Sequence, residues 1–217
     1  MRLDREKDAL VVVDVQHDFL PGGALGVAGG DAIVAPVAAL APRFATVVAT
    51  QDWHPPGHVS FASTHAGGKP FETVALPQGP QELWPDHCVQ GSRGAALHPA
   101  LPDPAITLVL RKGTRRDVDS YSAFRENAGP DGRRPTTGLG AWLAARGVSR
   151  VFVCGLARDF CVRATAVDAA AEGFEVLVLD DLTRAVFPER RAETDALLDR
   201  AGVHLAASAE LERSPRG

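Results

Sequence analysis

Short apolar runs, each closed by a polar residue or a glycine, alternate along this chain with longer alanine-rich segments. Apolar runs without a two-residue period are typical of strands buried on both faces, and the segments between them suit helical crossovers. The alternation therefore predicts an α/β fold with three layers, in which a mostly parallel sheet lies between two layers of helices. Six strands are predicted, at Ala9–Val13, Thr46–Thr50, Ile106–Leu110, Val151–Cys154, Val176–Leu179 and Val203–Leu205.

Helices are predicted at residues 32–40, 138–146, 160–172 and 188–200. Asp31 and Asp159 precede two of them and suit the N-cap position, where a side-chain oxygen accepts a free backbone N–H. Gly147, Gly173 and Gly202 stand where helices commonly end. With no repeat or linker in view, we expect a single domain over residues 1–217 whose core spans about 8–207.

The charge balance argues for small-molecule partners. The chain carries 23 Lys and Arg against 27 Asp and Glu, so it has no basic surplus for nucleic-acid phosphates or anionic lipid. Its charged start, Met1–Lys7, lacks a signal-peptide core, and no apolar run is long enough to cross a bilayer. Three cysteines without disulfide-like spacing favour free thiols in the cytoplasm. The sequence leaves open whether the chain forms a homo-oligomer.

Three reactive side chains follow predicted strands. Asp14 comes after the first strand, Lys112 after the third and Cys161 after the fourth, at the start of a predicted helix. The carboxyl ends of parallel strands line one crevice, so we expect these residues to meet there. Each has an ordinary alternative, as a turn aspartate, a solvated lysine or a core thiol, and the combination is what indicates a site.

This trio suits the hydrolysis of an amide. Near the helix N-terminus, Cys161 would meet free N–H groups that favour a thiolate, so we expect a depressed thiol pKa. Asp14 can take the thiol proton and later pass it to a leaving amine, while Lys112 would keep Asp14 ionised. Backbone N–H groups of Ala157 and Cys161 can form an oxyanion hole.

A second group suggests a divalent metal ion. Asp52 and His54 stand two apart in an extended segment, which points both side chains to one face, and His87 can add a third ligand. Three such ligands leave coordination positions open, as in catalytic sites. Zinc is our first choice, although iron and manganese suit the same ligands. His58 is either a fourth ligand or a hydrogen-bond partner of the ligands.

Aromatic side chains fall in the loops next to the predicted crevice. Phe19, Trp84 and Tyr121 can form flat walls for a planar ligand. Leu25, in a glycine-rich loop without a phosphate-binding lysine, and Leu156 add apolar surface. We therefore predict a pocket for a small planar substrate.

Together these pieces resemble the nicotinamidase and pyrazinamidase branch of the isochorismatase-like cysteine hydrolases, whose fold is Rossmann-like. The matching segments run in the family's order across most of the chain: Val13-Asp14-Val15-Gln16 with Asp18-Phe19, Gln51-Asp52-Trp53-His54, Trp84-Pro85 with His87-Cys88, Lys112-Gly113, and Cys154-Gly155-Leu156-Ala157 through Asp159-Phe160-Cys161-Val162.

The resemblance implies a six-stranded parallel sheet and a triad of Asp14, Lys112 and Cys161. It also implies a metal on Asp52, His54 and His87 that holds the pyridine nitrogen of the substrate, with the ring between aromatic walls such as Phe19 and Trp84. Tyr121 matches a further pocket position, and the Leu156–Ala157 peptide bond should be cis, aiming the Ala157 N–H into the oxyanion hole. The implied reaction converts nicotinamide to nicotinate and ammonia through a thioester on Cys161, and pyrazinamide should react as well.

Other readings stay open. Related enzymes act on carbamoyl or ureido compounds or cleave the isochorismate ether, but these branches generally lack the Asp-x-His metal motif. A metal-binding protein without turnover would have an unreactive Cys161. Segments 115–119 and 128–135 match no family motif and can change access to the pocket, so the range of substrates stays open.

Overall fold

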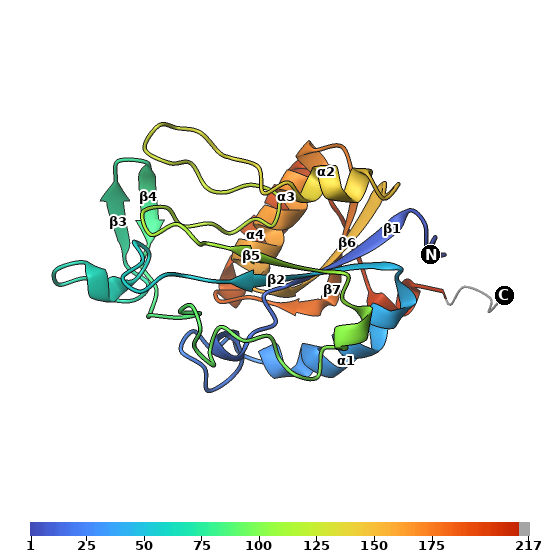
Figure 1. The fold of residues 1–217 in the computed structure, drawn as a ribbon, viewed down its shortest axis with the longest axis horizontal. Helices are drawn as coiled ribbons and strands as arrows, with labels where there is room; N and C mark the ends of the chain where they lie inside the picture. Colours follow the sequence, from blue (N-terminus) through green and yellow to red (C-terminus); the bar gives the residue numbers. More distant parts are fainter. Residues whose placement is uncertain (213–217) are drawn as a thin grey trace.

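The computed structural model describes residues 1–212, and its centre is a six-stranded sheet in the order β5-β2-β1-β6-β7-β8 (Figure 1). Neighbouring strands of this sheet pair in parallel, which confirms the predicted fold class. Its strands are β1 (Asp8–Val13), β2 (Thr46–Asp52), β5 (Leu108–Lys112), β6 (Arg150–Leu156), β7 (Glu175–Arg184) and β8 (His204–Ala206). The α-helices are α1 (Val34–Leu40), α2 (Leu139–Ala144), α3 (Arg163–Ala171) and α4 (Arg191–Arg200).

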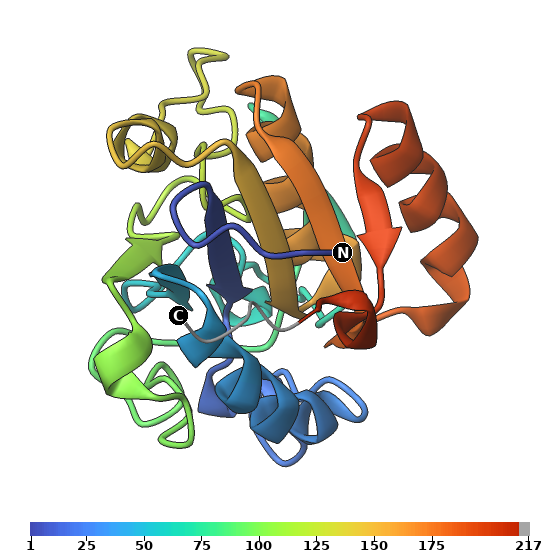
Figure 2. The ribbon, with the colours of Figure 1, turned by 90° about the vertical axis from the view of Figure 1, so that its right-hand side faces the viewer.

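Two hydrophobic cores lie on opposite faces of the sheet. Successive side chains of a strand point to opposite faces, so Leu10 and Val12 of β1 enter one core while Val11 and Val13 enter the other. Helix α1 packs on the first face, and α2, α3 and α4 cover the second (Figure 2). The three predicted layers are therefore present.

The order of the strands places a crevice beside β1. From β1 the chain builds outward through β2 to β5 at one edge, and then returns to the other side of β1 as β6. Ligands of open parallel sheets bind at the carboxyl ends of the strands where the winding direction changes in this way. Asp14 directly follows β1, and Cys161 follows β6, so both flank this point.

Several strands extend beyond their predicted carboxyl ends. Strand β2 continues to Asp52, β5 to Lys112 and β7 to Arg184, because the neighbouring strands still satisfy backbone hydrogen bonds where the side chains become polar. The antiparallel hairpin of β3 (Thr73–Leu76) and β4 (Gly79–Glu82) was not predicted. Its strands are only four residues long and half-buried or exposed at most positions, and the second contains Gly79 and Pro80, which are uncommon within strands.

The two predicted N-caps are wrong. Asp31 lies inside a 3-10 turn, Gly30–Ile33, that precedes α1. Asp159 lies inside a π-helical turn, Arg158–Val162, that leads into α3. Its carboxylate accepts the backbone N–H groups of Val186 and Phe187 at 3.0 and 2.8 Å, and so anchors the loop after β7.

The predicted helix ends agree with the backbone. Gly147, Gly173 and Gly202 follow α2, α3 and α4 with φ of 79°, 93° and 74°, a left-handed conformation that favours glycine. Within residues 1–212, no helix is both long enough and apolar enough to span a bilayer.

Candidate active site

Asp14, Lys112 and Cys161 meet at the carboxyl edge of the sheet, as their positions after strands predict. The Lys112 Nζ lies 2.7 Å from Asp14 Oδ2 and 3.3 Å from Cys161 Sγ. A carboxylate oxygen of Asp14 lies within 4.8 Å of that sulfur. All three side chains are buried, so this group is shielded from bulk solvent.

Lys112 also contacts Asp52, a contact that the sequence did not suggest. Asp52 and Lys112 are register partners on the adjacent strands β2 and β5, and the ammonium of Lys112 donates to Asp52 Oδ1. The Nζ atom thus lies among the carboxylates of Asp14 and Asp52, the sulfur of Cys161 and the carbonyl of Ser120. The ammonium therefore offsets part of the negative charge of the two carboxylates.

Burial dominates the electrostatics of the triad. Burial raises the pKa of the Cys161 thiol well above its ordinary value, and Lys112 only partly offsets this effect. Burial likewise raises the pKa of Asp14, in spite of Lys112. The expected depression of the thiol pKa is therefore wrong, whereas Lys112 does lower the pKa of Asp14 as expected, but by less than burial raises it. The resting thiol keeps its proton, and Asp14 is the nearby group of raised basicity.

The pKa values of Lys112 and Asp52 shift in the directions expected for an ion pair. Burial lowers the pKa of Lys112, but the carboxylates of Asp14 and Asp52 outweigh it and hold the pKa well above its ordinary value. Burial raises the pKa of Asp52, but Lys112 and His54 outweigh it and hold that pKa well below its ordinary value. Lys112 and Asp52 therefore stabilise each other in their charged forms.

Thr50 holds Asp14 in place, and no sequence signal identified it. Its hydroxyl donates to Asp14 Oδ1 at 2.6 Å and accepts the Asp14 N–H at 3.0 Å. Asp14 has a φ of 47°, in the left-handed region that non-glycine residues rarely adopt. Thr50 therefore helps to stabilise the turn that aims the carboxylate at the crevice.

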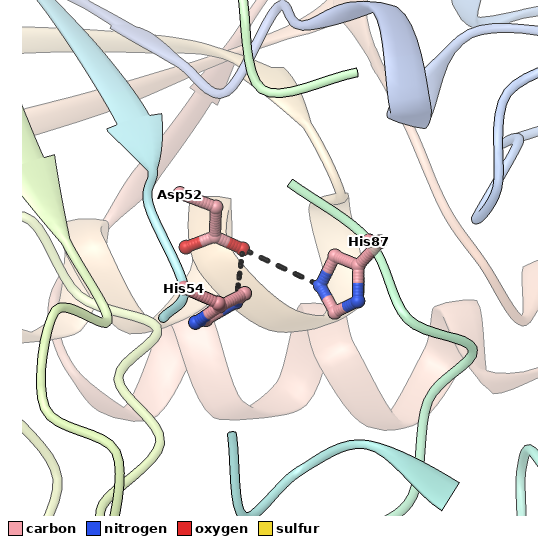
Figure 3. A group of neighbouring side chains, drawn as sticks. All are labelled: Asp52, His54 and His87. Atoms are coloured by element: carbon pink, nitrogen blue, oxygen red, sulfur yellow. Dashed lines mark ion pairs between the residues drawn. The ribbon is translucent and has the colours of Figure 1, made fainter. Parts of the chain in front are cut away.

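Asp52, His54 and His87 form a candidate metal centre. Asp52 Oδ2 lies 3.4 Å from His54 Nε2 and 3.7 Å from His87 Nε2 (Figure 3). All three side chains are buried, and their donor atoms lie within 4.8 Å of one another. One carboxylate and two imidazoles are a common ligand set for zinc and other divalent metals.

The hydrogen bonds at Nδ1 of His54 and His87 are consistent with a metal centre at Nε2. Nδ1 of His54 lies 2.9 Å from the Gly113 carbonyl, and Nδ1 of His87 lies 2.8 Å from the Pro85 carbonyl. A carbonyl only accepts, so each Nδ1 carries a hydrogen, and Nε2 of each ring faces Asp52, where it can bind a cation once it carries no proton. Two imidazole nitrogens and a carboxylate oxygen that converge within 4.8 Å of one another, with both rings held from behind by carbonyls, fit a divalent metal ion.

Gly113 makes room for this arrangement. Its φ is 64°, and a Cβ at this position would overlap the ring of His54. Only glycine places the carbonyl after Lys112 so close to the imidazole.

His58 lies behind the metal donors. Its ring stacks on that of His54 with a centroid distance of 4.2 Å, while Nε2 donates to the Val118 carbonyl at 3.2 Å. Nδ1 accepts from the Ser60 N–H at 3.3 Å and lies 2.8 Å from the Ser60 hydroxyl. Burial lowers the pKa of His58 to about 4, with His54 adding to the effect. Both nitrogens are engaged, which favours a supporting position over a fourth ligand.

A small pocket opens beside Cys161 of the triad and beside Asp52 and His87 of the metal donors. Most predicted pocket residues line it, namely Phe19, Leu25, Trp84, Tyr121, Ala157 and Cys161, together with Asp52 and His87. Leu156 does not line the pocket, contrary to the prediction. Its side chain is fully buried in the core and packs near Gly30. The Leu156–Ala157 peptide bond is cis, as the resemblance implied.

Asp119, Phe160 and Val186 also line the pocket and were not predicted. Asp119 is buried, accepts from Gln81 Nε2 at 2.8 Å, and so ties strand β4 to the pocket. It belongs to the charged segment 115–119, which therefore does contribute to the pocket. In segment 128–135, Arg134 forms a bidentate pair with Asp168 of α3, at 3.0 and 2.7 Å.

Comparison with known proteins is consistent with this geometry. Residues 8–210 match the isochorismatase domain family. The nicotinamidase of Acinetobacter baylyi is 51% identical over 178 residues, which are 82% of this chain and 81% of the relative. The nicotinamidase of Escherichia coli K12 is 43% identical over 212 residues, which are 95% of this chain and 97% of the relative.

Solved structures extend the likeness to three dimensions. A nicotinamidase and pyrazinamidase from Acinetobacter baumanii superimposes with a TM-score of 0.89 at 44% identity, over 94% of this chain and 98% of that one. A protein from L. infantum in complex with nicotinate gives 0.85 at 44% identity, over 98% of each chain. A Pyrococcus horikoshii pyrazinamidase in complex with zinc gives 0.73 at 36% identity, over 93% and 99%.

Proposed function

The chain belongs to the isochorismatase domain family, and from that premise we propose that it is a nicotinamidase that hydrolyses nicotinamide to nicotinate and ammonia through a thioester on Cys161. The observation that carries the proposal is the meeting of Asp14, Lys112 and Cys161 beneath a pocket with aromatic walls. Nicotinamidase relatives at 51% and 43% identity support the substrate.

Acylation begins with a proton transfer. Asp14 takes the proton of the Cys161 thiol, and the ammonium of Lys112, 3.3 Å from the sulfur, stabilises the thiolate. The sulfur attacks the amide carbon, and the N–H groups of Ala157 and Cys161 receive the developing oxyanion. Asp14 then returns the proton to the amide nitrogen as the C–N bond breaks, and ammonia leaves.

Deacylation reverses the roles with water in place of ammonia. Asp14 removes a proton from a water molecule, whose oxygen attacks the thioester carbon. The C–S bond breaks, nicotinate forms, and the proton held by Asp14 returns to the sulfur of Cys161. The raised pKa of Asp14 suits a group that must both accept and donate a proton in each turnover.

Asp52, His54 and His87 would hold one divalent metal ion, with His58 supporting His54 from behind. When bound, this ion supplies a Lewis-acid site at the pocket for the ring nitrogen of the substrate or for water. Zinc is the proposed ion, supported by the zinc complex of the Pyrococcus horikoshii relative. The aromatic walls of Phe19 and Trp84 orient the planar ring, and pyrazinamide, with the same amide and ring nitrogen, is a second substrate.

The direct test is ammonia release from three amides of the same shape. The purified protein should hydrolyse nicotinamide and pyrazinamide, and should hydrolyse benzamide, which lacks the ring nitrogen, much more slowly. Ammonia release from an unrelated amide but not from nicotinamide would contradict the proposed substrate.

Removal of the metal should abolish most of the activity. After chelation we expect nicotinamide hydrolysis to fall by about 100-fold or more, because a Lewis acid is worth several kcal/mol. Added zinc, manganese or iron should restore it. Elemental analysis should find one metal per chain in the wild type and none in His87→Ala, whereas His98→Ala, outside the donor group, keeps the metal. Full activity of a metal-free protein would overturn this role.

Trp84→Leu should weaken substrate binding. The indole lines the pocket and contacts Phe160 at a centroid distance of 4.8 Å, so its loss removes a stacking wall. We expect KM for nicotinamide to rise about five- to tenfold while kcat changes much less. The control is Trp142→Leu on α2, whose ring stacks on Arg146 away from the pocket. Equal effects of the two variants on KM would contradict the assignment.

A further inference from the structure

Gln16, which the mechanism above does not use, links the triad to the metal donors. It is fully buried and lies two residues after Asp14. Its Nε2 donates to the backbone carbonyl of Asp52, and its Oε1 accepts the backbone N–H of Asp52, both at 2.8 Å. The side-chain amide thus makes the two hydrogen bonds that a neighbouring strand would make.

The side chain continues a strand pairing that the backbone has ended. Strands β1 and β2 pair as far as Val12 and Ala49, and β1 ends at Val13 because Asp14 turns the chain at a φ of 47°. Strand β2 runs on to Asp52, which pairs with β5 on its other side. The Gln16 carboxamide occupies the position beside Asp52 that β1 has left.

Gln16 is itself held rigidly. The second hydrogen of Nε2 goes to the Ala95 carbonyl at 2.8 Å, so the side-chain amide uses both N–H donors and its oxygen. The backbone N–H of Gln16 donates to the Asp14 carbonyl at 2.8 Å. A shift of Asp52 relative to Asp14 would therefore break buried hydrogen bonds.

We propose that Gln16 is a positioning residue that sets the affinity of the metal centre by fixing the backbone of Asp52. The inference rests on the proposed metal role of Asp52, His54 and His87. The two carboxylate oxygens of Asp52 have different partners. Oδ1 accepts from Lys112, and Oδ2 faces the imidazoles of His54 and His87. A small rotation of this residue disturbs both contacts, and residues that orient metal ligands typically change metal affinity by about 10- to 100-fold.

The test compares two buried glutamines. Gln16→Met keeps the length of the side chain and removes its hydrogen bonds to Asp52. Gln51→Met is the matched control, since Gln51 donates to the same Ala95 carbonyl at 3.0 Å but does not bond to the backbone of Asp52. Zinc affinity of the metal-free proteins is measured by competition with a chromophoric chelator, and the cobalt-loaded proteins are compared by their visible absorption spectra.

We expect Gln16→Met to weaken zinc binding by about 10- to 100-fold and to change the cobalt spectrum, with Gln51→Met close to wild type. Equal zinc affinities in folded Gln16→Met and Gln51→Met would overturn the inference. If Gln16→Met does not fold, Gln16→Glu replaces it, because its carboxylate would face the Asp52 and Ala95 carbonyls, and wild-type zinc affinity in that variant would overturn the inference too. Wild-type protein that binds no zinc would instead overturn the proposed metal centre, and the inference with it.

Discussion

Replacement of Cys161 by alanine should lower the rate of ammonia release from nicotinamide by about four orders of magnitude or more. The sulfur forms the covalent bond to the substrate in the proposed reaction, and in the part of the chain that the structure describes it is the thiol that lines the pocket. Lys112 and Asp14 would remain, but a methyl group can neither attack the amide carbon nor carry the proton. The measurement is initial-rate ammonia release at saturating nicotinamide.

Cys154→Ala is the matched control for this variant. Cys154 lies on β6 in the hydrophobic core, and burial raises the pKa of its thiol well above the ordinary range. Its loss should reduce stability modestly and leave kcat near the wild-type value. After a short incubation with nicotinamide and acid quenching, mass spectrometry should find the acyl group on the peptide that contains Cys161. Substantial turnover by Cys161→Ala would refute the thioester mechanism.

Asp14→Asn should lower kcat for nicotinamide by about 1,000-fold, because an amide cannot accept the thiol proton. Asparagine nearly preserves the volume of the buried side chain, and its carbonyl can still accept the Thr50 hydroxyl. Lys112 keeps its ion pair with Asp52, so the fold should persist. The readout is kcat with KM at several pH values, together with thermal unfolding.

Asp8→Asn, at the start of β1, is the control for Asp14→Asn. Asp8 is also a buried aspartate, and it forms a bidentate pair with Arg150 at 2.8 and 2.7 Å. Asp8→Asn should reduce the free energy of unfolding by about 1.5–3 kcal/mol, typical of hydrogen bonds to charged groups, and leave kcat unchanged. If Asp14→Asn retained wild-type kcat, Asp14 would not be the proton carrier. Equal losses of kcat in both variants would point to a general effect of destabilising β1.

Much of the site was visible in local patterns. Each apolar run predicted a buried strand, and parallel strands end at a common edge, so Asp14 and Cys161 could be placed together although 147 positions separate their numbers (161 − 14). The spacing of Asp52 and His54 likewise predicted a shared face, and the structure shows both near His87.

Other residues of the site had no local signal. Thr50 bonds to Asp14, Gln16 to Asp52, and Asp119 to Gln81, across 36, 36 and 38 positions of sequence. Such polar contacts depend on the register between strands and on the path of loops, neither of which has a period in the sequence. The same holds for Leu156, which lies beside the site yet points into the core.

The amino-acid order alone specified which segments form the sheet, which reactive groups follow its strands and which donors stand ready for a metal, since these depend on periodicities of a few residues. The ionisation of those groups depended on the folded surroundings. A helix start suggested an acidic thiol at Cys161, whereas enclosure by the pocket and the core raises its pKa instead. Desolvation sums over all atoms packed around a group, most of which come from distant parts of the chain, and so it exists only once the chain has folded.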